Sequence, residues 1–415
     1  MSKLHKYAFS DLYDISSGIS STKEQAGHGA PFVSFSTVFN NYFLPDELPD
    51  LMDTSAVDQE KCSVKKGDIL ITRTSETVDE LAMSCVVLKD YPKATFSGFV
   101  KRLRPKTTGV AYDKYMAFFL RSEYFRKVIN AKTIMTLRAS FNEDIFSFLD
   151  LYLPDYEEQV KIGDFLYNIE KKIQCNKKIN DNLQHQLKLM YDYWFTQFDF
   201  PDENGKPYRA SGGAMVWNEQ LKRNIPAGWT VDNLYAVADY INGLACQNYR
   251  PDADERKLPV IKITEMHNGI TESTEFVRDD IPEKYIIDDG DILFSWSATL
   301  ETMLWYGGRG GLNQHIFKVV PKVPKYFAYS QLSAYIINFK AIAESRKTTM
   351  GHITTDHMDQ SRIAIPPKTI QETFNLQVTP IYEKIANNCK ENLRLQSLRD
   401  WLLPMLMNGQ ATISD

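Results

Sequence analysis

The sequence lacks the patterns that mark a disulfide framework or a metal site. Its five cysteines are odd in number and scattered, and none forms a C-x-x-C pair. The seven histidines include no H-E-x-x-H arrangement, so we expect no bound metal. Scattered, unpaired cysteines are typical of a reducing compartment, and we therefore expect a cytoplasmic protein.

Long apolar runs and nucleotide-binding loops are also missing. No apolar stretch approaches the ~18 residues that span a membrane, and the segment MSKLHKYAFSDLYD lacks the apolar centre of a secretory signal. The sequence has no G-x-x-x-x-G-K-[ST] loop, no G-x-G-x-x-G loop after a strand, and no Asn-Pro-Pro-aromatic stretch that would position an amino group for methyl transfer. These gaps favour a binding protein over an enzyme.

A net basic charge, the usual mark of a nucleic-acid binder, is absent, since the formal net charge is −5 at pH 7. The charge is unevenly distributed, however. Residues 89–138 contain 12 Lys and Arg against three acids, and residues 305–350 contain seven against one, which gives net charges of +9 and +6. Each block alone fits a solvated face. Their recurrence at matching places favours a surface that faces a polyanion.

The chain contains a long internal repeat. GDIL occurs at 67–70 and 290–293, RLRPK at 102–106 matches KVVPK at 318–322, and LPDYEEQ at 153–159 matches IPPKTIQ at 365–371. The offsets of 223, 216 and 212 residues indicate a tandem duplication of about half the chain, far longer than a solenoid repeat. GDIL predicts a turn that enters a strand, and Tyr115–Ile129 and Tyr326–Ile342 have helical spacing.

Each repeat ends in a stretch with heptad spacing. The core positions of the first stretch are Ile162, Leu166, Ile169, Ile173, Asn176, Asn180, Leu183, Leu187, Met190 and Trp194. Those of the second are Phe374, Val378, Ile381, Ile385, Asn388, Asn392, Leu395, Arg399, Leu402 and Leu406. This spacing predicts two long coiled-coil helices. Because the pattern breaks at Arg399 and Pro404 lies near the end, we expect the second helix to kink or fray there.

Two asparagine pairs occupy equivalent core layers of these helices, Asn176 with Asn180 and Asn388 with Asn392. Each asparagine could simply point to solvent at a loose layer. Buried asparagines, however, fix the register of a coiled coil at a cost in stability. The short link from the first helix into the second repeat favours an antiparallel arrangement. We therefore interpret the four asparagines as a register lock at the interface between antiparallel helices.

The duplicated chain resembles the specificity subunit of type I restriction–modification enzymes over its whole length. The most specific pieces are GDIL with its basic-Pro-Lys strand, the linker FDFPDENGKPY…GGAMVWNEQL…IPAGW, and the helix openings PDYEEQVKIGDFL and PPKTIQETFNLQV. The resemblance implies an α+β fold of two tandem mixed α/β target recognition domains, separated by two long helices that form an antiparallel coiled coil with pseudo-twofold symmetry. The implied target recognition domains are 1–153 and 201–365, and the implied conserved regions, with the long helices, are 154–200 and 366–415.

The resemblance also implies a function. The chain would be non-catalytic and would read a bipartite site in double-stranded DNA. Its partners would be two methyltransferase (modification) subunits and the restriction/translocase subunits of a bacterium or archaeon. It would bind no cofactor, since S-adenosylmethionine, ATP and Mg belong to the partner subunits. Two alternatives are a related system that cuts on both sides of its site and, in another class, a self-sufficient DNA-modifying enzyme.

For DNA contacts we expect residue types that bind phosphates or base edges, in three places of each repeat. After GDIL these are Arg73, Thr74 and Ser75, and Ser295, Trp296 and Ser297. In or before the basic strand they are Lys101, Arg102 and Arg104, and Asn313 and Gln314. In the turn before the last strand they are Arg138 and Ser140, and Lys347, Thr348, Thr349 and His352. Solvent-exposed strand ends are the competing interpretation.

Overall fold

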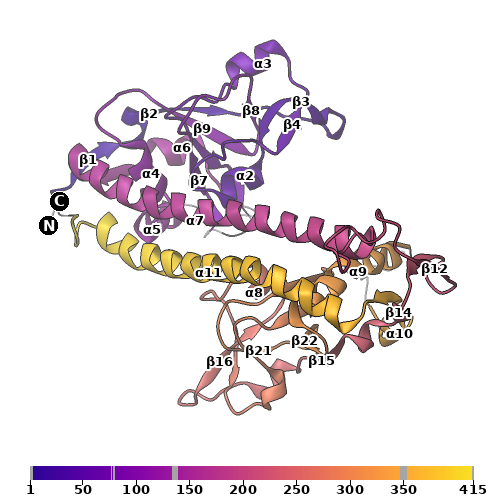
Figure 1. Ribbon diagram of the computed structural model, residues 1–415. Coiled ribbons are helices and arrows are strands. Elements are labelled where there is room, and N and C mark those ends of the chain that lie inside the picture. The colour runs from indigo at the N-terminus through magenta and orange to yellow at the C-terminus, as the bar shows by residue number, and fades with distance from the viewer. Residues whose placement is uncertain (1–2, 76, 78–79, 133–138, 346–352, 414–415) are drawn as a thin grey trace. The chain divides into compact units, whose positions relative to one another are not determined.

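The computed structural model describes residues 3–75, 77, 80–132, 139–345 and 353–413, and Figure 1 shows its helices and strands. The chain divides into two compact units. Unit 1 is Met1–Ile173 with Arg394–Asp415, and unit 2 is Gln174–Leu393. Each unit therefore contains one repeat together with parts of both long helices.

Unit 1 is built on two small sheets. The antiparallel four-stranded sheet has the order β2 (Tyr13–Ser17), β9 (Val100–Pro105), β5 (Ile69–Thr72), β7 (Ser84–Val86). The second sheet has the order β4 (Asp50–Met52), β3 (Ala26–Val33), β8 (Thr95–Phe96). Unit 1 also has two separate strand pairs, β1 (His5–Ala8) with β11 (Asp150–Leu153) and β6 (Thr74–Ser75) with β10 (Ala139–Ser140). Its shorter helices are α1 (Phe9–Leu12), α2 (Phe35–Asn40), α3 (Ala56–Lys61), α4 (Asp113–Phe119), α5 (Glu123–Lys132) and α6 (Glu143–Ser147).

Unit 2 repeats this plan. Its four-stranded sheet has the order β15 (Ala238–Asn242), β22 (Ile316–Pro321), β19 (Ile292–Ser295), β20 (Glu301–Leu304). Its second sheet has the order β17 (Phe276–Arg278), β16 (Lys257–Ile261), β21 (Gly310–Leu312), β18 (Ile286–Ile287). The strand pairs are β14 (Thr230–Asp232) with β23 (Ile363–Ile365) and β12 (Met215–Asn218) with β13 (Arg223–Pro226), and the helices are α8 (Ile263–Asn268), α9 (Lys325–Ser345) and α10 (Thr355–Asp359). The predicted duplication of a mixed α and β fold is confirmed.

The GDIL repeat forms the same turn in both units. Gly67 and Gly290 have φ angles of +87° and +92°, which favour glycine, and each turn leads directly into a fully buried strand, β5 or β19. The aspartate that follows closes the turn, since Asp68 accepts a hydrogen bond from the Lys65 amide (2.8 Å) and Asp291 accepts one from the Asp288 amide (2.9 Å). The predicted turn into a strand is confirmed.

The helical prediction for 326–342 is confirmed by α9, and the helical prediction for 115–129 is confirmed except for a break at 120–122. The structure has two helices there, α4 and α5. Between them the Ser122 hydroxyl donates to the Phe119 carbonyl (2.6 Å) and accepts from the Phe125 amide (3.3 Å). A serine that bonds to nearby backbone in this way competes with the helical ladder, so the chain ends one helix and begins another.

The two long helices are α7 (Tyr156–Tyr191), which continues into the π-helical turn η3 (Asp192–Thr196), and α11 (Lys368–Met407). Most of the predicted heptad positions are buried, including Ile162 and Leu166 on α7 and Phe374 and Val378 on α11. The predicted fraying at Arg399 is wrong, because α11 runs through that residue and through Pro404 to Met407, whereas the predicted kink stays a prediction. Even this longest of the described helices lacks an apolar stretch that could cross a membrane.

The helices pair in antiparallel fashion within each unit. In unit 2, the Asn176 side chain donates to Asn392 (2.9 Å) and the Asn388 side chain donates to Asn180 (2.7 Å). All four asparagines are less than 9% exposed. In unit 1, Arg399 of α11 forms an ion pair of 2.7 Å with Glu170 of α7. The interruption of the heptad is thus a charged layer between the helices, and an antiparallel helix pair is part of the fold, as predicted.

Candidate nucleic-acid interface

One end of each four-stranded sheet is built by the same backbone contacts. In unit 1 the Gly18 amide donates to the Val100 carbonyl (3.4 Å) and the Ile19 amide to the Phe96 carbonyl (2.9 Å). In unit 2 the Gly243 amide donates to Ile316 (3.0 Å) and the Leu244 amide to Leu312 (2.9 Å). The chain leaving β2 or β15 therefore lies against the turn that leads into β9 or β22.

This close approach requires a glycine in both units. A Cβ atom on Gly18 would lie 2.2 Å from the Ser97 carbonyl oxygen, and one on Gly243 would lie 2.2 Å from the Asn313 carbonyl oxygen. Both distances are far inside van der Waals contact. The sequences Ser-Gly-Ile at 17–19 and Asn-Gly-Leu at 242–244 are thus a further repeated signal in the sequence.

The residue after the central strand lies between two other segments. The Arg73 amide donates to the Phe99 carbonyl, and the Arg73 carbonyl accepts from the Phe141 amide, both at 2.8 Å. In unit 2 the Trp296 amide donates to His315 (3.4 Å), and the Trp296 carbonyl accepts from the Ile353 amide (3.0 Å). Arg73 and Trp296 therefore occupy equivalent positions.

We define the first sheet end as Ser17, Arg73, Thr74, Phe99, Lys101 and Ser140. Arg73 is exposed, and no ion pair joins it to another residue that the structure describes. Phe99 is 61% exposed. Ser140 pairs with Thr74 across β10 and β6, and both are partly exposed. A cation, an aromatic ring and hydroxyl groups therefore share this surface.

We define the second sheet end as Asn242, Trp296, Asn313, Gln314, His315 and Phe317. The Trp296 Nε1–H donates to Asn242 Oδ1 at 3.1 Å. Its ring centroid lies 5.8 Å from that of His315 and 6.0 Å from that of Phe317. Asn313 Oδ1 accepts from the His315 amide (3.2 Å) and shapes the turn. Amide groups and aromatic rings dominate this surface.

Several residues predicted to contact DNA after GDIL are buried instead. Ser75 is 9% exposed, Ser297 is 5% exposed, and Ser295 is fully buried. The Ser295 hydroxyl donates to the Ser297 carbonyl (3.2 Å), and the Ser75 hydroxyl accepts from the Thr77 amide (3.2 Å). These serines stabilise the strand ends, and their placement does not favour a contact with DNA.

The basic strand β9 uses its arginines internally, contrary to expectation. Arg104 binds Asp68 through two hydrogen bonds of 2.8 and 2.7 Å, and Asp68 is only 1% exposed. The hydrogen bond to Asp68 raises the pKa of Arg104. Arg102 donates to the Ser63 carbonyl (2.6 Å), and burial lowers its pKa. A buried carboxylate needs a cation, so Arg104 holds the GDIL turn; Lys318 does the same for Asp291 (2.9 Å).

Lys101 is also largely engaged within unit 1. Its ammonium group donates to the Ser17 hydroxyl (2.8 Å) and lies 3.6 Å from Glu143, and its side chain is 8% exposed. It can therefore contribute charge to the first sheet end without being a free side chain. The predicted contacts Arg138, Lys347, Thr348, Thr349 and His352 lie outside the residues that the structure describes.

Sequence analysis did not identify Ser17, Phe99, Asn242, His315 or Phe317 as part of these surfaces. The signal that could have found them is the Gly18 and Gly243 repeat, which brings β2 and β15 next to the turn before the basic strand. No single residue type marks these positions, because the two units carry different side chains there. The pairing register of the strands places these residues next to one another, and their residue types do not reveal it.

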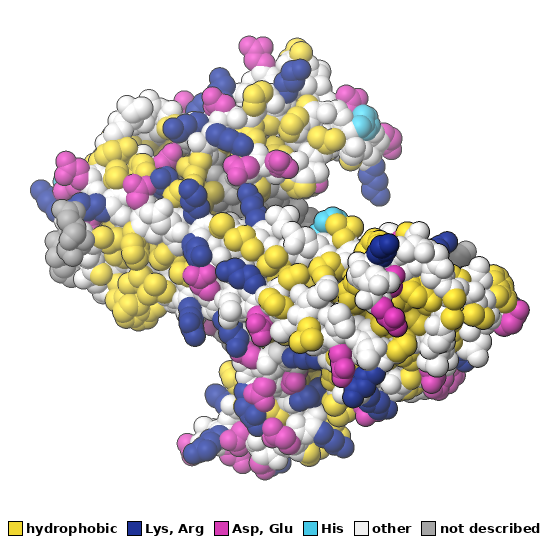
Figure 2. Space-filling model, in the orientation of Figure 1, with side chains coloured by type: hydrophobic (Ala, Val, Ile, Leu, Met, Phe, Trp, Pro, Cys, Tyr) yellow, Lys and Arg dark blue, Asp and Glu magenta, His cyan; other side chains and the backbone are white. Residues whose placement is uncertain are grey.

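Several Lys and Arg side chains of the two basic blocks pair with acids from elsewhere in their own unit. In unit 1, Lys106 pairs with Asp14 (3.1 Å) and Lys114 with Asp164 (2.7 Å). In unit 2, Lys322 pairs with Asp239 (2.6 Å). Figure 2 shows Lys and Arg side chains interspersed with Asp and Glu on the face in view. On this face the cations are therefore mixed with acids (Figure 2).

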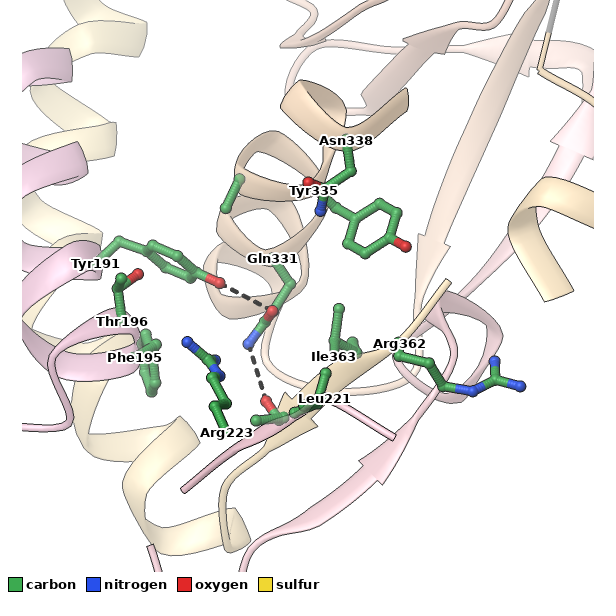
Figure 3. Close-up of a pocket in the computed structure, with 12 residues that line it drawn as sticks. Tyr191, Phe195, Thr196, Leu221, Arg223, Gln331, Tyr335, Asn338, Arg362 and Ile363 are labelled. Carbon is green, nitrogen blue, oxygen red and sulfur yellow. Dashed lines mark hydrogen bonds between the residues drawn. The ribbon is translucent and has the colours of Figure 1, made fainter. Parts of the chain in front are cut away.

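Unit 2 also contains a polar pocket of about 250 Å³, shown in Figure 3. The Tyr191 hydroxyl donates to Gln331 (2.9 Å), whose amide donates to the Ala364 carbonyl (3.5 Å). The Arg223 side chain lies beside this pair, whereas the Arg362 guanidinium points away. The lining contains no carboxylate, imidazole or thiol, and its polar side chains are hydroxyls, amides and guanidinium groups. Among the described residues, no group of His, Cys, Asp and Glu could hold a metal ion.

Comparisons with known proteins agree with this architecture. The model of the type I restriction modification DNA specificity domain matches residues 1–185 and 226–395. The chain is 25% identical to the type I restriction enzyme MjaIX specificity subunit of Methanocaldococcus jannaschii, over 86% of this chain and 81% of that protein. It is 24% identical to the type I restriction enzyme HindI specificity subunit of Haemophilus influenzae, over 96% and 98%.

The fold is similar to the crystal structure of a type I restriction-modification system S subunit from M. genitalium. The TM-score is 0.54 at 14% identity, and the match covers 98% of this chain and 96% of the other. At this identity the likeness concerns the fold alone.

Proposed function

The chain belongs to the family of type I restriction modification DNA specificity domains, and from this premise we propose that each sheet end reads one half of a bipartite DNA site. In this role the chain is a specificity subunit and carries out no chemistry itself. Its contribution is to select the DNA sequence on which partner subunits act.

The observation that carries the proposal is the duplicated sheet end. The same backbone hydrogen bonds occur in both units. Both units also have a glycine at the position where a Cβ atom would clash with a backbone carbonyl oxygen. The side chains on this shared backbone frame differ in chemical type, whereas in both units the aspartate of GDIL forms an ion pair with a basic residue of the neighbouring strand. A constant frame with different polar and aromatic groups suits two surfaces that read different base sequences.

The partners follow from the same role. We propose that two methyltransferase (modification) subunits bind this chain, and that restriction/translocase subunits complete the enzyme in the cytoplasm of a bacterium or archaeon. S-adenosylmethionine, ATP and Mg would be bound by those subunits. This division of labour is compatible with the net charge of −5 if partner subunits supply part of the contact with the phosphates.

Phe99→Ala tests the first sheet end. Phe99 is 61% exposed beside Arg73, where its ring can contact a base or sugar in a DNA groove. Loss of this apolar contact should weaken binding of the native site by ~1–2 kcal/mol, or about 5- to 30-fold in Kd. Binding of fluorescent duplex DNA to the full chain with its modification partner measures the change.

The matched control is Phe148→Ala. Phe148 is an even more exposed phenylalanine of unit 1 (73%) and lies outside the first sheet end. We expect its removal to leave Kd unchanged. Equal effects of the two substitutions would show that Phe99 has no special role and would remove the first sheet end from the proposed interface.

A further inference from the structure

The two sheet ends place different chemistry at equivalent positions. Ser17 pairs with Lys101 across β2 and β9, just as Asn242 pairs with Phe317 across β15 and β22. The equivalent pairs, with unit 1 first, are Ser17 and Asn242, Arg73 and Trp296, Phe99 and His315, and Lys101 and Phe317. Both cations of the first sheet end are therefore replaced by aromatic rings in the second.

At the first sheet end, Arg73 is the cation that can reach a ligand. Lys101 is held by the Ser17 hydroxyl at 2.8 Å and faces Glu143 at 3.6 Å, with only 8% of its side chain exposed. Arg73 is exposed, and its backbone is fixed on both sides by bonds to Phe99 and Phe141. A guanidinium group presents a planar fork of donors that matches O6 and N7 of guanine.

At the second sheet end, the Asn242 amide is held in a defined orientation. Its oxygen accepts from the Trp296 indole (3.1 Å), while its nitrogen has no acceptor among the residues that the structure describes. An asparagine amide matches N6 and N7 of adenine through one donor and one acceptor, and its oxygen retains a second lone pair for the base. The rings of Trp296, His315 and Phe317 form an aromatic patch beside it, and its carbon faces suit the methyl group of the paired thymine.

We propose that the two half-sites differ in base chemistry. Arg73 selects a G·C pair in the half-site that the first sheet end reads. Asn242 selects an A·T pair in the half-site that the second sheet end reads. Trp296 is a positioning residue for the Asn242 amide. This inference rests on the proposed function, because it assumes that both sheet ends face base edges.

The test uses the full chain with its modification partner and a duplex site obtained by selection from random DNA. Kd is measured for duplexes in which each base pair of the site is changed in turn. In the parent protein we expect a wrong base pair at a contacted position to raise Kd by about 10- to 100-fold. Arg73→Ala should abolish this discrimination at one G·C pair. Asn242→Ala should do the same at one A·T pair in the other half-site. Trp296→Phe keeps a ring but removes the indole donor, and should relax discrimination at that same A·T pair while leaving the first half-site unaffected.

Two exposed residues serve as controls. Lys66 lies at the opposite end of β5 from Arg73, and Trp217 is a 54% exposed tryptophan on β12. Neither Lys66→Ala nor Trp217→Ala should change discrimination at any position. A uniform loss of affinity in Arg73→Ala, with a salt dependence reduced by about one unit, would assign Arg73 to a phosphate and overturn the inference.

The inference also fails if the Arg73 effect maps to an A·T pair or the Asn242 effect to a G·C pair. Failure of the proposed function looks different. In that case the parent protein with its partner would select no sequence from random DNA, and there would be no discrimination for any variant to lose.

Discussion

Arg399→Ala should destabilise the helix pair of unit 1 by ~3–5 kcal/mol, because it removes the guanidinium that pairs with the buried Glu170 carboxylate. Glu170 is 7% exposed and binds Arg399 at 2.7 Å. The Arg399 guanidinium also packs against the Tyr42 ring, 5.1 Å from its centroid, so the substitution removes a contact with the globular part as well. Hydrogen exchange of the α11 amides at 394–407 measures this loss locally, without assuming that the whole chain unfolds in one step.

Unit 2 supplies a matched control for this substitution. At the offset of 212 residues, Glu170 corresponds to Tyr382 and Arg399 to Leu187, and these two are 5% and 6% exposed within the core of unit 2. The double variant Glu170→Tyr with Arg399→Leu therefore copies a layer that the protein already uses. It should be as stable as the parent or more so, since a buried ion pair often contributes no more than apolar packing. If the α11 amides of the Arg399→Ala variant exchanged hydrogen as slowly as those of the parent protein, the ion pair would not stabilise the helices.

Replacing Asn176, Asn180, Asn388 and Asn392 by leucine should make the helix pair more stable and less selective for register. The asparagines form two buried hydrogen-bonded layers, Asn176 with Asn392 and Asn180 with Asn388. Leucine would exchange these amides for apolar contacts, and leucine layers can slide past one another by a heptad. A slide of seven residues is ~10 Å, or about three base pairs of ~3.4 Å.

The charged layer opposes such a slide. A shift by one heptad would move Glu170 away from Arg399 and break this buried ion pair. We therefore expect the four-leucine variant to tolerate spacers altered by about three base pairs. The tolerance should widen when Glu170→Tyr and Arg399→Leu are added. Binding to duplexes that differ only in the spacer between the half-sites measures this, with the two-residue variant alone as the control. A sharp, unchanged spacer optimum in the six-residue variant would show that the helix register does not set the spacing.

The sequence predicted those features that follow from a local period or a repeated motif. The heptads of α7 and α11 and the GDIL turns depend on residues close together in the chain, so their spacing suffices to locate them. The break between α4 and α5 escaped the same reasoning, because Ser122 fits a helical pattern until its hydroxyl bonds to the backbone. At Arg399 the heptad rule failed for a different reason. Its partner Glu170 lies 229 residues away in the sequence.

The candidate interface was harder to predict. Arg102 and Arg104 have the residue type expected of a phosphate contact, but whether a cation is free depends on the carboxylates and carbonyls around it, and Asp68 and Ser63 take both. Phe99 and Asn242 differ in residue type from the equivalent residues of the other unit, His315 and Ser17. Their place at the sheet ends follows from the register of β2 with β9 and of β15 with β22, which only the three-dimensional pairing reveals.

We expect the two duplicated sheet ends each to read half of one DNA site. The most direct test is the Kd of the full chain with its modification partner for three duplexes: the native site, the site with its first half scrambled, and the site with its second half scrambled. We predict that scrambling either half weakens binding by ~100-fold or more, since each then loses several base contacts of ~1–3 kcal/mol. Binding that withstands the scrambling of one half would contradict the account, because only one of the two sheet ends would then read DNA.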